Sequence, residues 1–276
     1  MPKINANGLT MNYEQQGTGE PLVLIPYLSA DHACYAFQVA EYARHFTCIS
    51  LDLRGTGESD NTDGAYSTED LANDVAAFMQ ALGIPRAHIM GLSLGGAIGM
   101  WLAAKHPESI ASLSLHSTWP KTDLYIKTVI GSFQQTARGI GSVPEMVISA
   151  LFPWCLTPDL YAAKPDYIEQ LTAFVRSRPV QSVESFVQQS NAVIGHDAEA
   201  QLVRITAPTL ITFGRHDAAT STRFADRLQR GIRNSELLIF EASSHAPIYE
   251  QIEEFNQKTL AFLQRHAGKA TEPLVA

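Results

Sequence analysis

The stretch Gly91-Leu92-Ser93-Leu94-Gly95 constrains the fold of this chain more than any other. An apolar run from Ala87 to Met90 precedes it, and a helix-like run from Ala97 to Ala104 follows it. A G-x-S-x-G pattern between a strand and a helix predicts a tight, strained turn that lifts the serine hydroxyl above a sheet. The two glycines leave room where a Cβ would collide with the strand or the helix.

Strands and helices alternate on both sides of this turn. Asn7-Gly8 predicts a hairpin near the start of the chain, and Ser67 with Asp70 predicts the capped start of a helix that ends at Gly83. Further strands are expected at 21–25, 46–51, 110–116, 209–213 and 236–240, and a last helix at 249–264. This alternation predicts an α/β fold, with a mostly parallel sheet covered by helices on both faces.

Between about Trp119 and His196 the strand-like runs disappear. Helical patterns occur instead at 124–137, 145–151, 167–175 and 183–193, separated by Pro and Gly. We therefore expect residues 1–119 and 200–267 to form an α/β core and residues 120–199 to form a helical cap. Residues 268–276 are expected to be a disordered tail.

Composition excludes several classes of partner. The chain has 276 residues, a hydrophobic fraction of 45% and a formal net charge of −8. This negative charge disfavours nucleic acid and anionic membranes as main partners.

Neither a secretory signal nor an apolar run long enough to span a bilayer is visible. Cys34, Cys48 and Cys155 are odd in number and widely spaced, so they form neither a disulfide framework nor a metal pattern. A cytoplasmic protein without metal or cofactor is expected, and a homo-oligomer is left open.

A serine hydroxyl becomes a useful nucleophile only when a base takes its proton, and that base is usually a histidine oriented by a carboxylate. His245 follows the last predicted strand, and Asp217 follows the strand at 209–213. Ligands of such folds bind at the carboxyl ends of the strands, where all three side chains are expected. The order Ser93, Asp217, His245 is that of one fold family. Asp123, which follows the strand at 110–116, is the alternative acid.

Four stretches together give the chain a family resemblance. With 91–96, 52–59, 208–217 and Ser244-His245, it resembles the α/β-hydrolase superfamily over essentially its whole length. It is most similar to small bacterial esterases, 3-oxoadipate enol-lactonase-like enzymes and carbon–carbon bond hydrolases. The resemblance implies an α/β-hydrolase fold with an inserted helical cap. It also implies that Asp52 and Arg54 fix a loop near the site.

The resemblance further implies an oxyanion hole built from two backbone N–H groups. Leu94 would supply one, and Leu28, in the loop after the third strand, would supply the other. The chain departs from the family at the start of this loop, where Pro26-Tyr27 replaces the usual His-Gly. Proline has no N–H, and tyrosine cannot take a positive φ cheaply. Tyr27 could place its phenol in the pocket or pack outward.

These observations predict a serine hydrolase that cleaves a carboxylic ester or lactone of a small, apolar or aromatic molecule. Tyr27, Leu28, Trp119 and Trp154 are the candidate substrate-binding residues. Two alternatives stay open. One is a carbon–carbon bond hydrolase with the same triad, for which three cap arginines could bind a carboxylate; the other is a non-catalytic ligand-binding protein. The candidate arginines are Arg138, Arg176 and Arg178.

Overall fold

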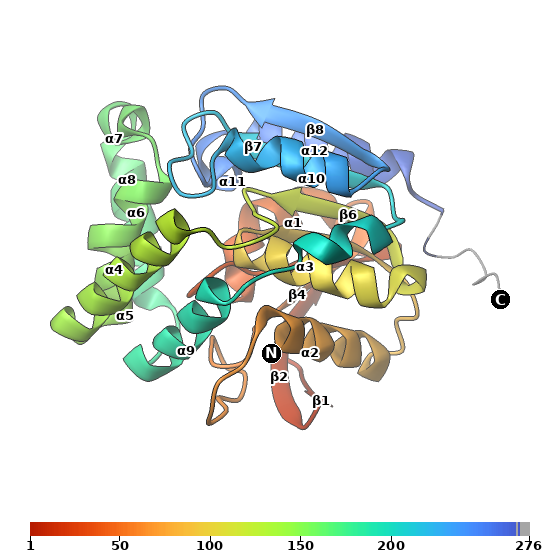
Figure 1. Cartoon of the computed structure of the whole chain (residues 1–276), viewed down its shortest axis with the longest axis horizontal. Coiled ribbons are helices and arrows are strands. Elements are labelled where there is room, and N and C mark those ends of the chain that lie inside the picture. Colours follow the sequence, from red (N-terminus) through yellow and green to blue (C-terminus); the bar gives the residue numbers. More distant parts are fainter. Residues whose placement is uncertain (269, 271–276) are drawn as a thin grey trace.

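The computed structural model describes residues 1–268 and residue 270. Its centre is an eight-stranded sheet in the order β1-β2-β4-β3-β5-β6-β7-β8 (Figure 1). Strand β2 pairs antiparallel with β1 and β4, and all the other neighbours pair parallel. The strands are β1 (Lys3–Ala6), β2 (Leu9–Gln16), β3 (Glu20–Ile25), β4 (Phe46–Leu51), β5 (Ala87–Leu92), β6 (Ile110–His116), β7 (Thr209–Gly214) and β8 (Ser235–Phe240).

Helices cover both faces of this sheet. The first hydrophobic core lies between the sheet and α2, α3 and α10, and the second lies between the sheet and α1 and α12. The α-helices outside the insert are α1 (Ala36–Tyr42), α2 (Thr68–Ala81), α3 (Leu94–Lys105), α10 (Ala225–Gly231), α11 (Pro247–Glu250) and α12 (Ile252–Arg265). Short 3-10 turns lie at His32–Tyr35, Pro107–Ser109, Glu199–Arg204 and Thr222–Phe224. The predicted fold class, a mostly parallel sheet with helices on both faces, is confirmed.

Local sequence signals set several of these boundaries. Asn7 and Gly8 both have positive φ, 51° and 75°, which is the geometry of a tight two-residue hairpin between β1 and β2. Ser67 and Asp70 form a reciprocal capping box at the start of α2. Gly83 follows that helix with a φ of 70°.

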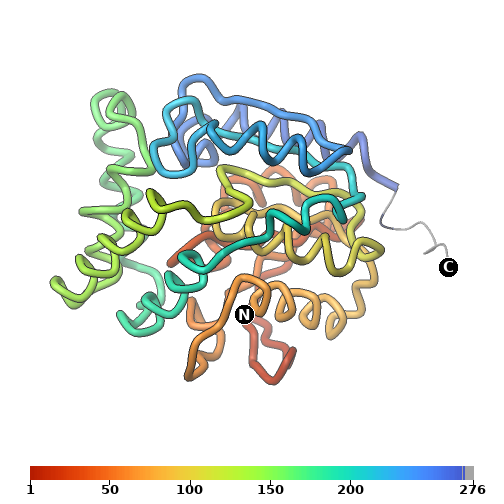
Figure 2. Tube along the Cα trace, in the orientation of Figure 1, coloured from red at the N-terminus to blue at the C-terminus, as the bar shows by residue number. Residues whose placement is uncertain are grey.

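The chain leaves the core after β6 and returns to it before β7 (Figures 1 and 2). The excursion consists of α4 (Leu124–Ile140), α5 (Val143–Met146), a π-helical turn (Val147–Leu151), α6 (Phe152–Cys155), α7 (Pro158–Ala163), α8 (Pro165–Ser177) and α9 (Val183–Ile194). We call these helices the cap, while the division of the chain into core and cap subdomains stays a prediction. The predicted helix at 145–151 covers the end of α5 and the whole π-helical turn, and α6 and α7 were not predicted.

The end of the chain differs from expectation in one respect. The helix predicted at 249–264 is two helices, α11 and α12, which break at Gln251, where φ is −128° and ψ is 52°. Of the predicted tail at 268–276, residue 269 and residues 271–276 lie outside the described residues. No described helix is long and apolar enough to cross a membrane.

Candidate active site

The turn between β5 and α3 has the predicted strained geometry. Ser93 sits at φ 55° and ψ −114°, outside the regions that most side chains adopt. A Cβ on Gly91 would lie 2.2 Å from the Gly95 carbonyl oxygen, and a Cβ on Gly95 would lie 2.1 Å from that of Ile25. The Ser93 N–H donates to the carbonyl of His116 at 2.8 Å, which anchors the turn to β6. Only glycine at both positions therefore permits this turn.

Asp217 and His245, which lie 28 residues apart, meet beside this turn. His245 Nδ1 is 2.9 Å from Asp217 Oδ2. The other carboxylate oxygen, Oδ1, accepts the backbone N–H groups of Ala219 and Thr220, each at 2.8 Å. The Thr220 hydroxyl lies 2.9 Å from Oδ2 and donates to the Ser117 carbonyl at 2.8 Å. The carboxylate is thus held at both oxygens, and one of them points at the imidazole.

Charge and burial act against each other at Asp217. Burial by itself would raise the pKa of this carboxyl group, but the His245 imidazole and the hydrogen bond from the Thr220 backbone N–H lower it below its usual value. Asp217 is therefore an ionised hydrogen-bond acceptor at neutral pH.

Glu250 braces the loop that carries His245, because it accepts the Ser244 N–H at 2.6 Å and the Ser243 hydroxyl at 2.9 Å.

A cavity of about 140 Å³ opens over Ser93 and His245. Tyr27, Leu28, Trp119 and Trp154 all line it. The rest of the wall is mostly apolar and comes largely from the cap, with Ile126, Val129, Ile130, Phe133, Val147, Leu151, Phe152, Leu171, Phe174 and Val175. Met146 and Phe186 are not in the wall, since they pack in the core of the molecule. The site is a small apolar chamber with a serine and a histidine in its wall.

Tyr27 belongs to this wall and also makes a polar contact. Its hydroxyl lies 2.8 Å from that of Tyr249, which donates to the Cys34 carbonyl at 2.8 Å. Because Tyr249 uses its proton on that carbonyl, Tyr27 is the donor of the pair. Burial raises the pKa of Tyr27 well above its usual value, so the phenol stays protonated. Of the two arrangements left open by the sequence, the structure has the phenol at the cavity.

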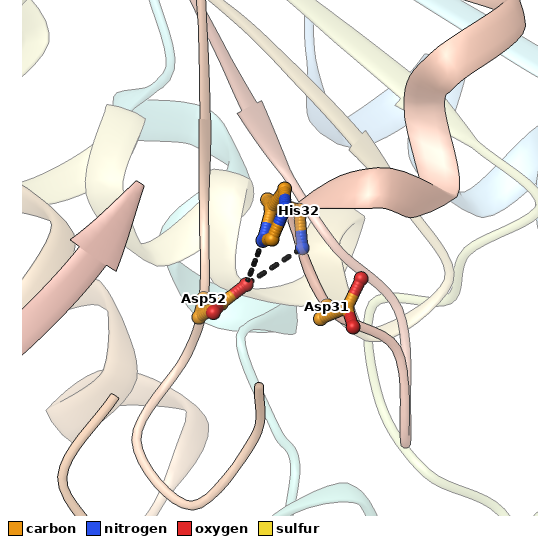
Figure 3. A group of neighbouring side chains, drawn as sticks. All are labelled: Asp31, His32 and Asp52. Atoms are coloured by element: carbon orange, nitrogen blue, oxygen red, sulfur yellow. Dashed lines mark hydrogen bonds and ion pairs between the residues drawn. The ribbon is translucent and has the colours of Figure 1, made fainter. Parts of the chain in front are cut away.

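Asp31, His32 and Asp52 form a buried polar cluster next to the loop after β3 (Figure 3). Asp52 Oδ1 accepts from both the backbone N–H and the Nδ1 of His32 at 2.7 Å, as Figure 3 shows. Asp52 Oδ2 accepts from Asn12 at 2.8 Å and from the Glu58 N–H at 2.9 Å. These donors already occupy both oxygens, so the cluster fits a metal ion poorly. It fixes loops, as the family resemblance implied for Asp52.

The cap arginines differ in their surroundings. Arg178 lines the cavity, but its Nε donates to Asp31 Oδ2 at 2.8 Å. Arg176 pairs with Glu145 on the exposed side of the cap, and Arg138 is exposed and absent from the cavity wall. The cationic group that reaches the cavity is therefore paired with a carboxylate that also reaches it.

The structure also places the weaker candidates. Asp123 caps α4 by accepting the Ile126 N–H at 2.8 Å and is 3.2 Å from Arg223, so it serves that helix and not His245. His216 is exposed. His116 is buried, and burial lowers its pKa to about 3, which keeps it neutral. Cys34 and Cys155 line the cavity as free thiols whose pKa burial raises.

Sequence reasoning missed four residues that support the site: Thr220, Tyr249, Glu250 and, on α9 of the cap, Gln189. Thr220 alone had a local signal, since it follows Asp217 by three residues, the spacing at which a threonine hydroxyl can reach a carboxylate. The partners of the other three are set by how distant helices pack.

A family model, two related proteins and one solved structure show which family the chain belongs to. A model of the α/β hydrolase fold family matches residues 20–251. The 3-oxoadipate enol-lactonase 2 of Acinetobacter baylyi is 28% identical, over 95% of this chain and 96% of the relative. A protein of Azorhizobium caulinodans named as a carbamate hydrolase, RutD, is 25% identical over 95% and 98%. The crystal structure of the enol-lactonase from Burkholderia xenovorans LB400 superposes with a TM-score of 0.84 at 26% identity, over 95% of this chain and 100% of that one. The elbow, the strand order and these matches agree, and the chain belongs to the α/β hydrolase fold family.

Proposed function

We propose that this protein is a serine hydrolase that cleaves a carboxylic ester or lactone, with Ser93 as the nucleophile. The observation that carries the proposal is the 2.9 Å contact between His245 Nδ1 and Asp217 Oδ2 beside the cavity that Ser93 lines. An ionised carboxylate keeps the imidazole proton on Nδ1, which leaves Nε2 free to accept the serine proton. Asp217 therefore orients the base, and His245 is the base.

The proposed reaction has two halves. Ser93 Oγ attacks the carbonyl carbon while His245 Nε2 takes its proton, and the oxyanion accepts hydrogen bonds from the backbone N–H groups of Leu94 and Leu28. The tetrahedral adduct collapses, and the leaving alcohol takes the proton from His245. Water, deprotonated by His245, then attacks the acyl carbon and releases Ser93. Side chains, backbone donors and water supply every step, so the proposal includes no cofactor.

The cavity wall supports a small substrate with an apolar or aromatic acyl group. Its cap side is built from aliphatic and aromatic side chains, and its charged lining includes Arg178, which is paired with Asp31. Because these two charges offset each other, the chamber favours an uncharged ester or lactone over an anionic one. The enol-lactonase relatives, at 26% and 28% identity, support a lactone among the substrates.

Each of two other functions is favoured by one observation. Arg178 in the wall favours carbon–carbon bond cleavage of a carboxylated substrate, but Asp31 already neutralises it. The departure at Pro26-Tyr27, which places Tyr27 in the cavity wall, favours a binding protein that does not turn over its ligand. Both rank below the ester or lactone hydrolase.

The decisive experiment treats the protein with a fluorophosphonate probe, with Ser93→Ala and Ser109→Ala as the two variants. Ser109 lies at the amino end of β6, away from the carboxyl ends of the strands. We expect the wild type and Ser109→Ala to be labelled and Ser93→Ala to lose labelling. Hydrolysis of p-nitrophenyl acetate by Ser93→Ala should fall about 10³-fold or more. An unlabelled wild type without turnover would instead support the binding protein.

A substrate panel then separates the enzymes. It contains p-nitrophenyl esters of increasing chain length, neutral lactones, an enol-lactone with a carboxylate, a carbamate and a dienoic diketone. We expect the highest kcat/KM among neutral esters and lactones. A preference for the dienoic diketone would replace the proposed reaction by carbon–carbon bond hydrolysis.

A further inference from the structure

The loop after β3 is held in a costly conformation directly beside the proposed oxyanion donor Leu28. Ser29 has a φ of 61°, in the left-handed region that non-glycine residues rarely enter. Such a conformation persists only where the surroundings hold it in place. The contacts of Ser29 therefore show what positions this loop.

Ser29 is held by a local turn, in which the Ala30 N–H donates to the Tyr27 carbonyl at 3.1 Å, and by the cap. Its backbone N–H donates to Oε1 of Gln189 at 2.8 Å. Gln189 lies on α9 and is fully buried. The same oxygen lies 3.4 Å from Nε2 of Gln181, which also donates to the Gly55 carbonyl at 3.0 Å. Two donors thus converge on Oε1, which fixes the orientation of the Gln189 carboxamide.

One end of the Gln189 carboxamide is unfavourable where it lies. Its Nε2 is buried and has no hydrogen-bond partner among the described residues. A buried N–H without a partner is unfavourable, and an apolar side chain of the same size would avoid this cost. An apolar side chain would, however, leave the Ser29 N–H without its acceptor, so the bond to Ser29 is what a glutamine supplies at this position.

The other side of Leu28 is anchored by the core. Tyr27 donates to Tyr249 of α11, which is bonded in turn to the Cys34 carbonyl. The peptide that carries the Leu28 N–H therefore lies between an anchor in the core, at Tyr27, and an anchor in the cap, at Ser29. With both neighbours held, the direction of that N–H is set before a substrate binds.

We propose that Gln189 is a positioning residue, through which the cap sets the Leu28 N–H for the oxyanion. The inference rests on the proposed serine hydrolase function. An oxyanion donor helps only when it is already aimed at the developing charge, and losing one donor typically lowers turnover about 10²–10³-fold. Loss of the Gln189 bond leaves the donor present but loosely held. The effect is therefore smaller than a lost donor and falls on kcat more than on KM.

The test is Gln189→Met, which keeps the size of the side chain and removes the acceptor. We expect kcat for a p-nitrophenyl ester to fall about 10-fold or more while KM changes less than about 3-fold. A boronic acid that forms a tetrahedral adduct on Ser93 should bind more weakly by a similar factor. An uncharged product alcohol, which leaves the oxyanion site empty, should bind as it does to the wild type.

The matched control is Gln134→Met. Gln134 is also a largely buried cap glutamine, but it bonds Asn191 inside the cap at 2.9 Å and does not line the cavity. We expect it to keep kcat within about 2-fold of the wild type. If Gln189→Met does not fold, Gln189→Asn retains a carboxamide but withdraws its oxygen from Ser29, and it should show the same loss of kcat.

Failure of the Gln189 proposal can be distinguished from failure of the hydrolase proposal. Wild-type kcat and boronic acid affinity in a folded Gln189 variant, or an equal loss in Gln134→Met, would overturn the role of Gln189 and leave the hydrolase intact. Unchanged fluorophosphonate labelling in Ser93→Ala would remove the hydrolase proposal itself, and this inference with it.

Discussion

At the scale of single residues, the two oxygens of Asp217 have separate tasks. Oδ1 accepts two backbone N–H groups, from Ala219 and Thr220, while Oδ2 faces His245. An amide in place of this carboxylate would keep its oxygen at the two backbone donors, because an NH₂ group there would meet them donor to donor. The NH₂ group would then point at His245.

Asp217→Asn should therefore reverse the imidazole tautomer. The new NH₂ group donates to Nδ1, which puts the ring proton on Nε2. A protonated Nε2 can no longer accept the proton from Ser93. We expect kcat/KM for p-nitrophenyl acetate to fall about 10³–10⁴-fold with little change in the thermal midpoint. Asp123→Asn is the control, since Asp123 caps α4, and it should retain activity within about 3-fold. Equal losses in both variants would contradict the assignment of the acid.

At the scale of elements, the elbow depends on contacts between backbones. The atoms that a Cβ on Gly91 or Gly95 would strike are backbone atoms of α3 and of the end of β3, so no side chain can move aside. Gly131, in the middle of α4, would have open space around an added Cβ, with no other atom within 4 Å, and its φ is not positive. Substitution of these two kinds of glycine should have opposite effects.

Gly91→Ala should lower the free energy of unfolding by about 3 kcal/mol or more, because the added methyl cannot be accommodated. Gly131→Ala should raise it by about 0.5–1 kcal/mol, since alanine loses less backbone entropy in a helix. Urea unfolding followed by circular dichroism measures both changes. A Gly91→Ala protein as stable as the wild type would show that the elbow has another geometry.

The difference between local pattern and distant contact explains which elements and residues could be predicted from the sequence. The strands at 46–51 and 110–116 were predicted to the residue, because buried apolar runs between turn signals depend on local pattern. Helix α7 was missed, because Leu160 is the one buried side chain in its six residues and no apolar periodicity arises. Ser93, Asp217 and His245 followed from their places after strands. Gln189 and Tyr249 did not, because their partners come from 160 and 222 residues away.

At the scale of the whole molecule, buried histidines link stability to pH. Burial lowers the pKa of His116 to about 3 and that of His196 to about 4. His196 joins the cap to the core, because its Nδ1 lies 2.8 Å from the Thr68 hydroxyl and its Nε2 lies 3.1 Å from the Trp119 carbonyl. His32 behaves in the opposite way: burial alone would lower its pKa, but Asp52 raises it.

These shifts predict greatest stability near pH 6.5, the ordinary pKa of histidine. Below it, the unfolded chain binds protons at His116 and His196 that the folded protein excludes, so each costs up to about 1.4 kcal/mol per pH unit. Above it, the stability that His32 contributes is lost as pH rises through its raised folded pKa. Urea unfolding between pH 4.5 and 8.5 measures the profile.

A variant pair identifies the source of the acid limb. His196→Gln keeps a donor and an acceptor but cannot be protonated, so its stability should fall less steeply below pH 6.5. His106→Gln, at a partly exposed position near Glu108, is the matched control. A slope unaffected by His196→Gln would assign the acid sensitivity to other groups.

The position of α9 has a consequence for protein engineering. Grafting a foreign lid onto a hydrolase scaffold is an obvious way to recruit new substrates, and here the insert begins and ends at neighbouring strands. Helices α4 and α5 supply wall to the chamber, whereas the segment from α6 to α8 also bonds the residues around His245, and α9 carries the carboxamide that holds Ser29. A chimera that exchanges α4 and α5 and retains α6 to α9 should inherit the donor's selectivity with the host's turnover. One that exchanges α9 as well should inherit the selectivity and lose the rate.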